Sequence, residues 1–342
     1  MPRIDFNEER ISMQHGSGGQ ATRRLVEGLF AREFSNEALD QLGDSALLDA
    51  GGTRIAMTTD SFVVKPHMFP GGSIGSLAVH GTVNDLAVSG AEPLGLTAGF
   101  VLEAGLSSDA LRAQVRAMAD AAKHAGVNIV SGDTKVVENG KADGLYINTS
   151  GVGLFRSDAR LAPQNAKPGD AVLVSGPIGD HGITIMIARD ELDIEADLAS
   201  DSRSVLPMTR ALLDALGTDV RWMRDATRGG VATVLNELAE DARLGVVVEE
   251  VQIPVRDEVR GACELLGLDP LHVANEGQFV AVVDGARADE ALAAVRATPG
   301  GERASIIGRV SNEPIGRVVG RTEFGAQRVI DVLVGDPLPR IC

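Results

Sequence analysis

The fold class is decided by Arg54-Ile55-Ala56-Met57-Thr58-Thr59, together with the stretch Ser73-Ile74-Gly75-Ser76-Leu77-Ala78-Val79-His80-Gly81-Thr82-Val83-Asn84-Asp85-Leu86-Ala87-Val88-Ser89. The first stretch is short and rich in apolar and β-branched residues, so it predicts a strand. The second predicts a helix, because small or apolar residues recur at helical spacing: Ile74, Leu77, Ala78, Gly81 and Val88. A strand followed by such a helix indicates a protein that packs helices on sheets.

The same alternation of strands and helices continues to the end of the chain. Further strands are predicted at 145–150, 171–175, 246–251 and 279–283, and further helices at 107–126 and directly after 225–230. The chain is therefore expected to be an α/β (α+β) protein.

A polar stretch with two prolines and no periodicity, 162–170, predicts a domain boundary. We expect an N-terminal glycine-rich segment and helix, two domains and a tail, over 1–35, 36–160, 166–334 and 335–342 respectively.

Length and charge limit the possible functions. A chain of 342 residues is long enough for two domains with ample cores. Its formal net charge of −16 argues against nucleic acid or an anionic membrane as the main partner, since both need a basic face. The sequence has no apolar run near the roughly 18 residues that span a bilayer. The N-terminus has no apolar signal-peptide region, and we expect a cytoplasmic protein.

The two cysteines exclude a disulfide framework. Cys263 falls on the apolar stripe of a predicted helix and is expected to be a buried small hydrophobe. Cys342 ends the segment Gly335-Asp336-Pro337-Leu338-Pro339-Arg340-Ile341-Cys342, whose prolines favour an extended path. At about 3.1 Å per residue this segment reaches roughly 25 Å. It indicates a nucleophile on a semi-rigid arm; the alternative is a frayed terminus that happens to end in Cys.

Aspartates recur where apolar elements end or are interrupted, at Asp44, Asp60, Asp85 and Asp133. A carboxylate is costly to bury there without a partner. Mg²⁺ prefers oxygen ligands and often bridges carboxylates to phosphate, so converging aspartates would suit a magnesium nucleotide. The alternative for each one is a helix cap or turn residue.

The N-terminal segment His15-Gly16-Ser17-Gly18-Gly19 precedes a predicted helix. Successive small residues let backbone N–H groups point at an anion, although the spacing is not that of a P-loop. A flexible loop is an equal alternative. Arg228-Gly229-Gly230 follows the same logic at the second-domain helix.

Lys135 and Glu276 are the candidates for proton transfer. Lys135 follows Asp133 by two residues, and Glu276 precedes an apolar strand. Each would usually be a solvated surface residue, but next to a nucleotide site each could handle protons if its pKa were shifted. His80 shares a helix face with Asn84, and we assign it no function.

Taken together, these segments resemble the HypE family of hydrogenase maturation carbamoyl dehydratases, within the PurM-like (aminoimidazole ribonucleotide synthetase-like) superfamily. The resemblance covers nearly the whole chain. The terminal Pro-Arg-Ile-Cys is specific to this family, whereas the segments around Asn84-Asp85 and Asp225 are shared across the superfamily. It rests on 15–19, 43–46, 58–61, 80–87, 132–137, 225–230, 275–277 and 339–342.

The resemblance implies two PurM-like domains, each a mixed sheet packed with helices, and a homodimer formed through the first domains. It implies ATP and Mg²⁺ as cofactors, with Asp44, Asp85 and Asp133 as metal ligands. Cys342 would receive a carbamoyl group from the carbamoyltransferase HypF, and ATP would drive its dehydration to a thiocyanate. The cyanide would pass through the HypC–HypD complex to the iron of a [NiFe] hydrogenase.

The resemblance also implies roles for individual residues. Cys342, Lys135 and Glu276 would be catalytic. The nucleotide would be bound by Gly16, Ser17, Gly18, Gly19, Asp44, Asp60, Asn84, Asp85 and Asp133.

Two other functions compete with this one. Another ATP-using enzyme of the superfamily, such as selenophosphate synthetase or thiamine-phosphate kinase, would not need Cys342. A selenophosphate synthetase would carry Cys or selenocysteine in its N-terminal glycine-rich segment, where this chain has none. A non-catalytic carrier would present Cys342 to partners and hydrolyse no ATP.

Overall fold

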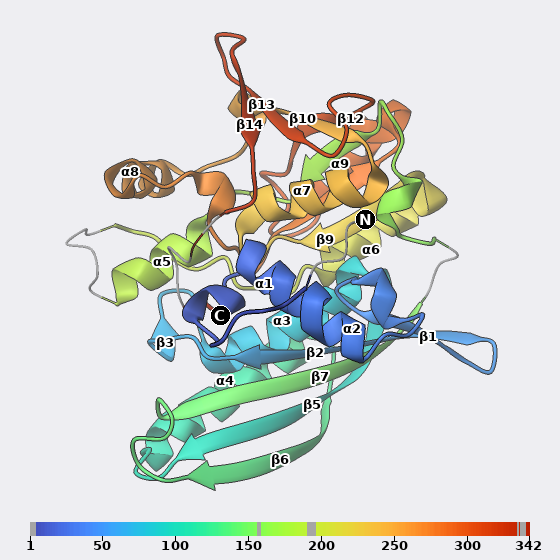
Figure 1. Ribbon diagram of the computed structural model, residues 1–342. Helices are drawn as coiled ribbons and strands as arrows, with labels where there is room; N and C mark the ends of the chain where they lie inside the picture. The colour runs from blue at the N-terminus through green and yellow to red at the C-terminus, as the bar shows by residue number, and fades with distance from the viewer. Residues whose placement is uncertain (1–4, 156–158, 190–195, 334, 336–339) are drawn as a thin grey trace.

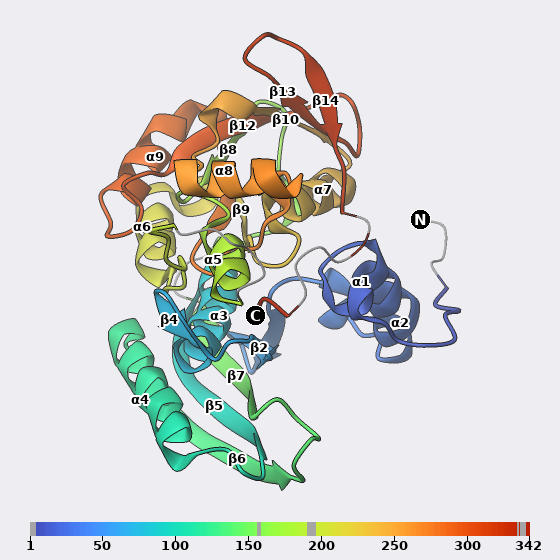
Figure 2. The same ribbon diagram turned by 90° about the vertical axis from the view of Figure 1, so that its left-hand side faces the viewer.

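The computed structural model describes residues 5–155, 159–189, 196–333, 335 and 340–342. Two sheets, each packed with helices, lie one above the other (Figure 1). A group of short N-terminal helices lies beside both layers (Figure 2). The predicted α/β (α+β) class is confirmed, since parallel and antiparallel pairs occur in both sheets.

The first sheet and its two helices contain the stretches that predicted the fold class. Helix α3 (Ile74–Val88) begins at Ser73, whose hydroxyl accepts the backbone N–H of Ser76, and α4 (Ser108–Ala125) begins at Ser107 in the same way. α3 packs on the sheet, and α4 packs on α3. The strands lie in the order β1 (Ala46–Ala50), β2 (Thr53–Phe62), β7 (Leu145–Phe155), β5 (Ala91–Glu103) and β6 (Ile129–Val137).

The second sheet is buried on both faces at its centre. Val280 and Val282 face a core that includes α7 (Gly230–Ala242), while Phe279 and Ala281 face the core of α6 (Leu206–Leu216) and α9 (Ala288–Arg296). The strands lie in the order β14 (Gln327–Ile330), β13 (Val318–Arg321), β10 (Gly245–Glu249), β12 (Ser305–Ser311), β8 (Ala171–Val174), β11 (Phe279–Val283) and β9 (Val220–Asp225).

The remaining elements are short. Cys263 is buried on α8 (Asp257–Leu266), as predicted from its stripe. The others are α5 (Asp180–Ala188), the hairpin of β3 (Met68–Phe69) and β4 (Gly72–Ser73), and 3-10 turns at Pro163–Asn165, Gly217–Asp219, Glu250–Gln252, Pro270–His272 and Gly285–Arg287. In the part of the chain that is described, no helix has the length and apolarity needed to cross a membrane.

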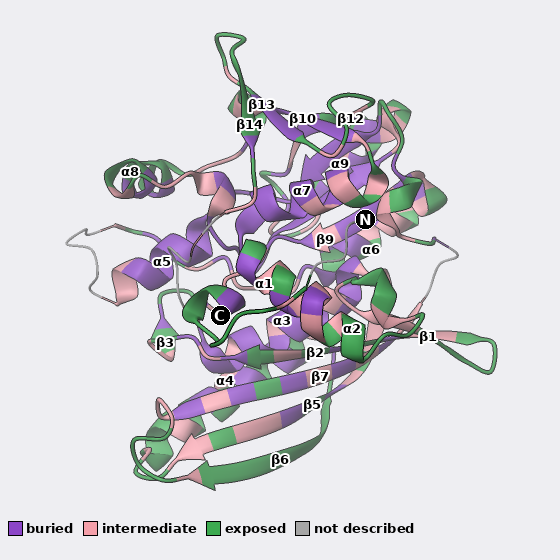
Figure 3. Cartoon of the chain, viewed as in Figure 1, coloured by how far each residue is buried: buried purple, intermediate pink, exposed green. Residues whose placement is uncertain are grey.

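Helix α3 joins the two layers. Leu77 and Ala87 of α3 belong to the same buried core as Met223 of β9 and Phe279 of β11. α3 also packs against α6, and Figure 3 shows this central region as buried. Because one helix contributes to both cores, residues on α3 are placed directly against the second domain.

The N-terminal segment consists of the 3-10 turn Met13–Gly16, α1 (Gln20–Leu25), a π-helical turn Val26–Phe30, α2 (Ala31–Glu33) and the 3-10 turn Leu39–Gln41. Arg23 of α1 forms ion pairs with Glu240 of α7 and with Glu27. This segment therefore lies along the second domain before the chain enters the first sheet.

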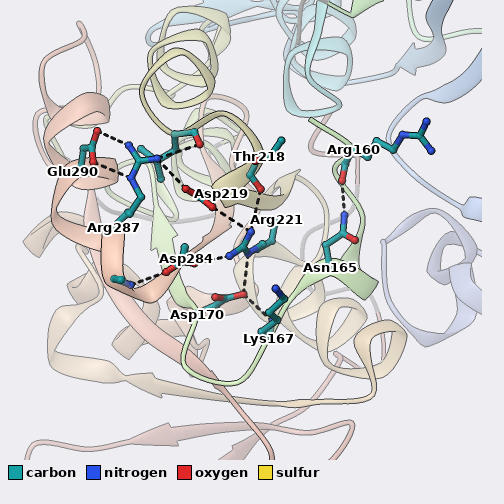
Figure 4. A network of polar contacts seen from close by, with 12 residues as sticks. Arg160, Asn165, Lys167, Asp170, Thr218, Asp219, Arg221, Asp284, Arg287 and Glu290 are labelled. Atoms are coloured by element: carbon teal, nitrogen blue, oxygen red, sulfur yellow. Dashed lines mark hydrogen bonds and ion pairs between the residues drawn. The ribbon is translucent and has the colours of Figure 1, made fainter. Parts of the chain in front are cut away.

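The entry into the second domain is held by a polar network (Figure 4). Asp170 accepts the backbone N–H of Lys167 at 2.8 Å and lies 3.5 Å from the guanidinium of Arg221. Arg221 also pairs with Asp284 at 2.6 Å and with Asp219 at 3.5 Å. These contacts tie the 162–170 stretch to β9 and to the end of β11.

Candidate active site

A cavity of about 480 Å³ lies where the N-terminal segment, the first sheet and the second domain meet. Residues from all three parts line it, among them Gly18, Asp44, Asp85, Arg228, Glu276 and Cys342. Of the predicted site residues, Gly18, Gly19, Asp44, Asp60, Asp85, Glu276 and Cys342 line this cavity.

Three carboxylates form the acidic centre of the cavity. Asp44 precedes β1, Asp85 lies on α3, and Asp225 ends β9; each offers an oxygen within 4.8 Å of the others. Asp85 accepts a hydrogen bond from the Thr58 hydroxyl at 2.6 Å. Strand pairing places Asp225, since β9 pairs with β11 at the edge of the second sheet and Asp225 is opposite Phe279.

Burial sets the electrostatics of this cluster. It raises the pKa of Asp44 to about 6, although the Arg224 guanidinium at 2.8 Å acts in the opposite direction. Burial, and then the neighbouring carboxylates, raise the pKa values of Asp85 and Asp225 well above the ordinary carboxyl range. Three buried carboxylates at this separation repel one another, so the cluster is suited to a cation.

The predicted metal set, Asp44, Asp85 and Asp133, differs from this cluster. Asp225 is the third member of the cluster, the position for which Asp133 was predicted. Asp133 is instead on β6, and about two thirds of its side chain is exposed. A buried strand ending in Asp before Arg228-Gly229-Gly230 was the sequence signal for Asp225. At the level of sequence, that segment indicates the start of a helix, a possible anion-binding turn and a motif shared across the superfamily, and Asp225 has no assigned role there.

Asp60 extends the acidic wall from β2. Burial raises its pKa, and the Arg228 guanidinium lowers it. Arg228 is the arginine of the cavity that lies beside Cys342, and its own pKa is raised by the neighbouring Cys342 and by Asp60, Glu276 and Asp225, against the effect of burial.

The glycines of the N-terminal segment allow close backbone contact. Gly18 has φ +78°, and a Cβ on it would lie 2.7 Å from the carbonyl oxygen of Arg228. Gly16 and Ser17 lie outside the main cavity and line a second one of about 360 Å³, which also contacts Arg228 and Cys342. Arg228 donates to the carbonyl oxygen of Gly16 at 2.9 Å, so the two glycine-containing segments form one unit.

Glu276 is buried with one free oxygen. Its side-chain Oε1 is among the buried atoms without a hydrogen-bond partner in the described residues. Burial and the carboxylates of Asp225, Asp201 and Asp60 raise its pKa well above the ordinary range, while Arg228 lowers it. A buried carboxyl of this kind, facing a cavity, is suited to proton transfer.

Asn84 does not line the cavity. Its amide nitrogen donates to the carbonyl oxygens of Arg203 at 2.9 Å and Glu276 at 3.1 Å, and its oxygen accepts the Val205 N–H at 2.8 Å. The side chain is therefore engaged with the protein backbone, in contrast to the predicted contact with nucleotide.

The end of the chain lies inside the molecule, in the position that an inward-folded arm would take. Ile341 is buried in the shared core, and the half-buried Cys342 lines both cavities. Burial raises the pKa of the Cys342 thiol to about 12, with Arg228 opposing that rise. Arg340, two residues before Cys342, pairs with Asp143. The prolines of the predicted arm lie outside the described residues.

Lys135 and Asp133 form a pair at 2.5 Å on β6. β6 pairs in parallel with β5, and Lys135 is opposite Val101. Phe100 and Leu102, on either side of Val101, pack against the core, so the Lys135 side chain is on the opposite, outer face of the sheet. In the described residues of a single chain, neither Lys135 nor Asp133 lines the main cavity.

The AIR synthase related protein family matches the chain twice, its N-terminal domain over residues 42–155 and its C-terminal domain over residues 167–321. Carbamoyl dehydratase HypE of Azotobacter vinelandii is 49% identical over 342 residues, covering 100% of both chains. Carbamoyl dehydratase HypE of Escherichia coli is 45% identical, covering 97% of this chain and 99% of that protein.

Solved structures of HypE proteins also match the chain. A crystal structure of a HypE–HypF complex matches with a TM-score of 0.86 at 46% identity, covering 90% of this chain and 99% of that one. HypE in complex with ATP matches with a TM-score of 0.82 at 46% identity, covering 97% and 100%. Thiamine monophosphate kinase of Aquifex aeolicus shares the fold. Its structure matches with a TM-score of 0.62 at 18% identity, covering 88% of this chain and 96% of that one.

Proposed function

The chain belongs to the HypE family of carbamoyl dehydratases, enzymes of hydrogenase maturation, and from this premise we propose that it dehydrates an S-carbamoyl group on its own Cys342. The product is a thiocyanate on the same sulfur, formed at the expense of ATP. One observation carries this proposal: the Cys342 thiol lies in the cavity that also holds the carboxylate cluster and Glu276.

The reaction requires a leaving group and a base. Transfer of the γ-phosphoryl group from ATP to the carbamoyl oxygen makes that oxygen a leaving group, as one N–H proton is lost. Departure of phosphate with loss of the second N–H proton then forms the C≡N bond. Glu276 is our candidate to accept such a proton, because Glu276 and Cys342 line the same cavity and the buried Oε1 has no hydrogen-bond partner in the described residues.

The acidic cluster fits Mg²⁺. Asp44, Asp85 and Asp225 would hold the ion, since three hard oxygen donors converge there and Arg224 pairs with one of them, Asp44. A bound Mg²⁺ would supply charge neutralisation for the phosphates. Arg224 holds Asp44 in place through a 2.8 Å ion pair and is itself held by Glu237 at 3.4 Å.

ATP would lie along the glycine-containing wall of the same cavity. Gly18 and Gly19 line it with Arg228, and the absence of side chains on the two glycines lets phosphate approach the backbone closely. A related HypE has been crystallised with ATP, which supports the same substrate for this chain. Asp60 also lines this cavity. Asn84 instead holds the backbone of Arg203 and Glu276, so we assign it a structural role in the site.

We propose a homodimer through the outer face of the first sheet. Met57 of β2 and Val101 of β5 are exposed there, 48% and 36% respectively, and Val101 is opposite the exposed Lys135 of β6. Figure 3 shows most of β6 as exposed. Exposed apolar side chains on a sheet face favour association. The second subunit would place Lys135 and Asp133 against its partner's cavity, which would restore both residues to the site for which the sequence predicted them.

The partners follow from the same chemistry. A related HypE forms a complex with HypF, which supports HypF as the carbamoyl donor to Cys342. The HypC–HypD complex would accept the cyanide for the iron of a [NiFe] hydrogenase, in the cytoplasm.

Intact-protein mass spectrometry tests the function directly. The protein is incubated with HypF, carbamoyl phosphate and ATP, with Cys342→Ala as the control. We expect a gain of about 43 Da followed by an ATP-dependent loss of about 18 Da, the formula masses of the added carbamoyl group and the lost water. A folded, ATP-binding protein that is never modified would instead support a small-molecule enzyme of the superfamily.

A further inference from the structure

The last three carbonyl groups of the chain are each held by a different donor. Arg189, directly after α5, donates to the carbonyl oxygen of Arg340. His181 Nε2 lies 2.8 Å from the carbonyl oxygen of Ile341, and the Val63 N–H donates to the Cys342 oxygen at 3.0 Å. These contacts fix the path of the main chain up to the reacting thiol, since each recognises a backbone oxygen.

His181 is the buried member of this set. It lies in the first turn of α5 with 0% exposure, and the Phe69 ring packs edge-on against its imidazole with centroids 5.7 Å apart. A carbonyl oxygen only accepts hydrogen bonds, so Nε2 must carry the imidazole hydrogen. Burial lowers the pKa of His181 to about 4, and the neutral ring therefore donates from Nε2 alone at neutral pH.

Ser200 selects this tautomer. Its hydroxyl lies 2.7 Å from His181 Nδ1 and accepts the backbone N–H of Ser202 at 3.1 Å. The hydroxyl hydrogen is thus available for Nδ1, which leaves the imidazole hydrogen on Nε2, facing Ile341. Ser200 is itself held through its backbone N–H, which donates to Pro70 at 2.9 Å.

The residue next to Ser200 holds the candidate base. The buried Asp201 carboxylate accepts the backbone N–H groups of Glu276 at 3.0 Å and Gly277 at 3.3 Å. Ser200 and Asp201 are adjacent in the chain, so the displacement of one is transmitted to the other. One short segment therefore holds both the thiol-bearing end of the chain and the backbone of Glu276.

From these contacts we infer that His181, oriented by Ser200, is a positioning residue for dehydration: it sets how far Cys342 enters the cavity and aligns it with Glu276 through the shared Ser200–Asp201 segment. The inference rests on the proposed function. It assigns His181 no contact with the reacting atoms. Loss of its hydrogen bond should release the end of the chain while leaving the nucleotide wall intact.

Thiol alkylation measures the release without any turnover. The full-length protein is treated with N-ethylmaleimide, and the modification of Cys342 and Cys263 is followed by peptide mass spectrometry. In His181→Ala we expect alkylation of Cys342 to be about fivefold to tenfold faster, the factor that corresponds to losing one hydrogen bond. Cys263 is 1% exposed and packs in a core with Ile183 and Met186 of α5, so its unchanged rate reports that the helix carrying His181 remains packed.

Two further variants sharpen the result. His181→Gln keeps an N–H donor and should recover part of the protection of Cys342. His80→Gln is the matched control, because His80 also pairs with a serine of this segment, Ser202 at 3.0 Å, and burial lowers its pKa to about 4. Among the described residues His80 forms no hydrogen bond with the tail, so Cys342 alkylation should not change in that variant.

The catalytic part of the inference uses Cys342 that has already been carbamoylated by HypF. We expect His181→Ala to accept the carbamoyl group normally, since that step needs the arm extended, and to dehydrate it about fivefold to tenfold more slowly at saturating ATP. Faster alkylation with unchanged dehydration would overturn the positioning role. Unchanged alkylation of Cys342 would overturn the contact itself.

The remaining outcomes also decide the matter. If His181→Ala exposes Cys263 as well, Ser200→Ala is the decisive variant, because it keeps the imidazole and removes only the hydroxyl that selects the tautomer. If Cys342 in Ser200→Ala is then protected from alkylation as well as in the unsubstituted protein, the inference is contradicted. If no variant, including the unsubstituted protein, is ever carbamoylated, the proposed function fails while the alkylation result still reports on the His181 contact.

Discussion

Asn84 of α3 donates a hydrogen bond to the carbonyl oxygen of Glu276 at 3.1 Å, so a helix of the first domain holds the loop that carries the candidate base in the second. The Glu276 N–H is held from the other side by Asp201 at 3.0 Å. The backbone of Glu276 is thus fixed on both sides, while its buried Oε1 has no hydrogen-bond partner in the described residues. The domain interface and the base are thus parts of one arrangement.

Glu276→Gln should separate chemistry from binding. The amide preserves the shape and the backbone contacts of Glu276 but cannot accept a proton, so we expect dehydration to slow by about two to four orders of magnitude. ATP affinity, measured by calorimetry, should remain nearly intact. A collapse of ATP affinity would mean that Glu276 binds nucleotide and that its catalytic assignment is wrong.

The acidic cluster predicts a specific dependence of stability on pH. Because the pKa of Asp44 rises from 3.8 to about 6 on folding, and those of Asp85 and Asp225 rise further, the folded state binds protons more tightly than the unfolded state. This stabilising contribution is complete below the ordinary carboxyl pKa and is lost as the pH rises through the folded values.

Added Mg²⁺ should reverse that loss, since it binds the ionised carboxylates of the folded state. We therefore expect Mg²⁺ to raise the melting temperature more at about pH 7.5 than at about pH 5, as followed by thermal unfolding. Asp225→Asn should abolish most of this difference. An equal loss in Asp133→Asn would return Asp133 to the metal site, through the partner subunit.

Subunit mixing tests whether Lys135 serves its partner. Lys135→Ala and Glu276→Gln proteins, each impaired alone, are unfolded together and refolded as mixed dimers. If Lys135 of one subunit completes the cavity of the other, a mixed dimer holds one cavity with both residues intact, and thiocyanate formation should reappear. Activity that never exceeds that of the separate variants would argue that both residues act within one chain, or that the dimer has another form.

Gly18→Ala should destabilise the junction between the N-terminal segment and the second domain. The new Cβ would lie 2.7 Å from the Arg228 carbonyl oxygen at a φ of +78°, so either the N-terminal segment or the Arg228 backbone must move. We expect a loss of about 1–3 kcal/mol in unfolding free energy, measured by urea denaturation. Gly16→Ala is the matched control, because nothing lies within 4 Å of a Cβ there; an equal loss at Gly16 would contradict this explanation.

Local sequence pattern was sufficient for the elements and for many of the site residues. Helical spacing predicted α3 and α4, and α4 (Ser108–Ala125) lies within the range 107–126 predicted for it. The strand predicted at 246–251 was correct except at its end, where the chain turns into the 3-10 turn Glu250–Gln252. These features depend on periods of 2 and 3.6 residues, which a single sequence displays directly.

The sequence by itself determined the alternation of strands and helices, the burial of Cys263 and the candidates Asp44, Asp60, Asp85, Glu276 and Cys342. Three features became visible only in the folded chain: Asp225 completes the carboxylate cluster, Arg228 lies beside Cys342, and Asn84 donates a hydrogen bond to the backbone of Glu276. The physical reason is that convergence depends on pairing between distant strands and on packing between domains. Neither leaves a periodic signature in the residues that are brought together.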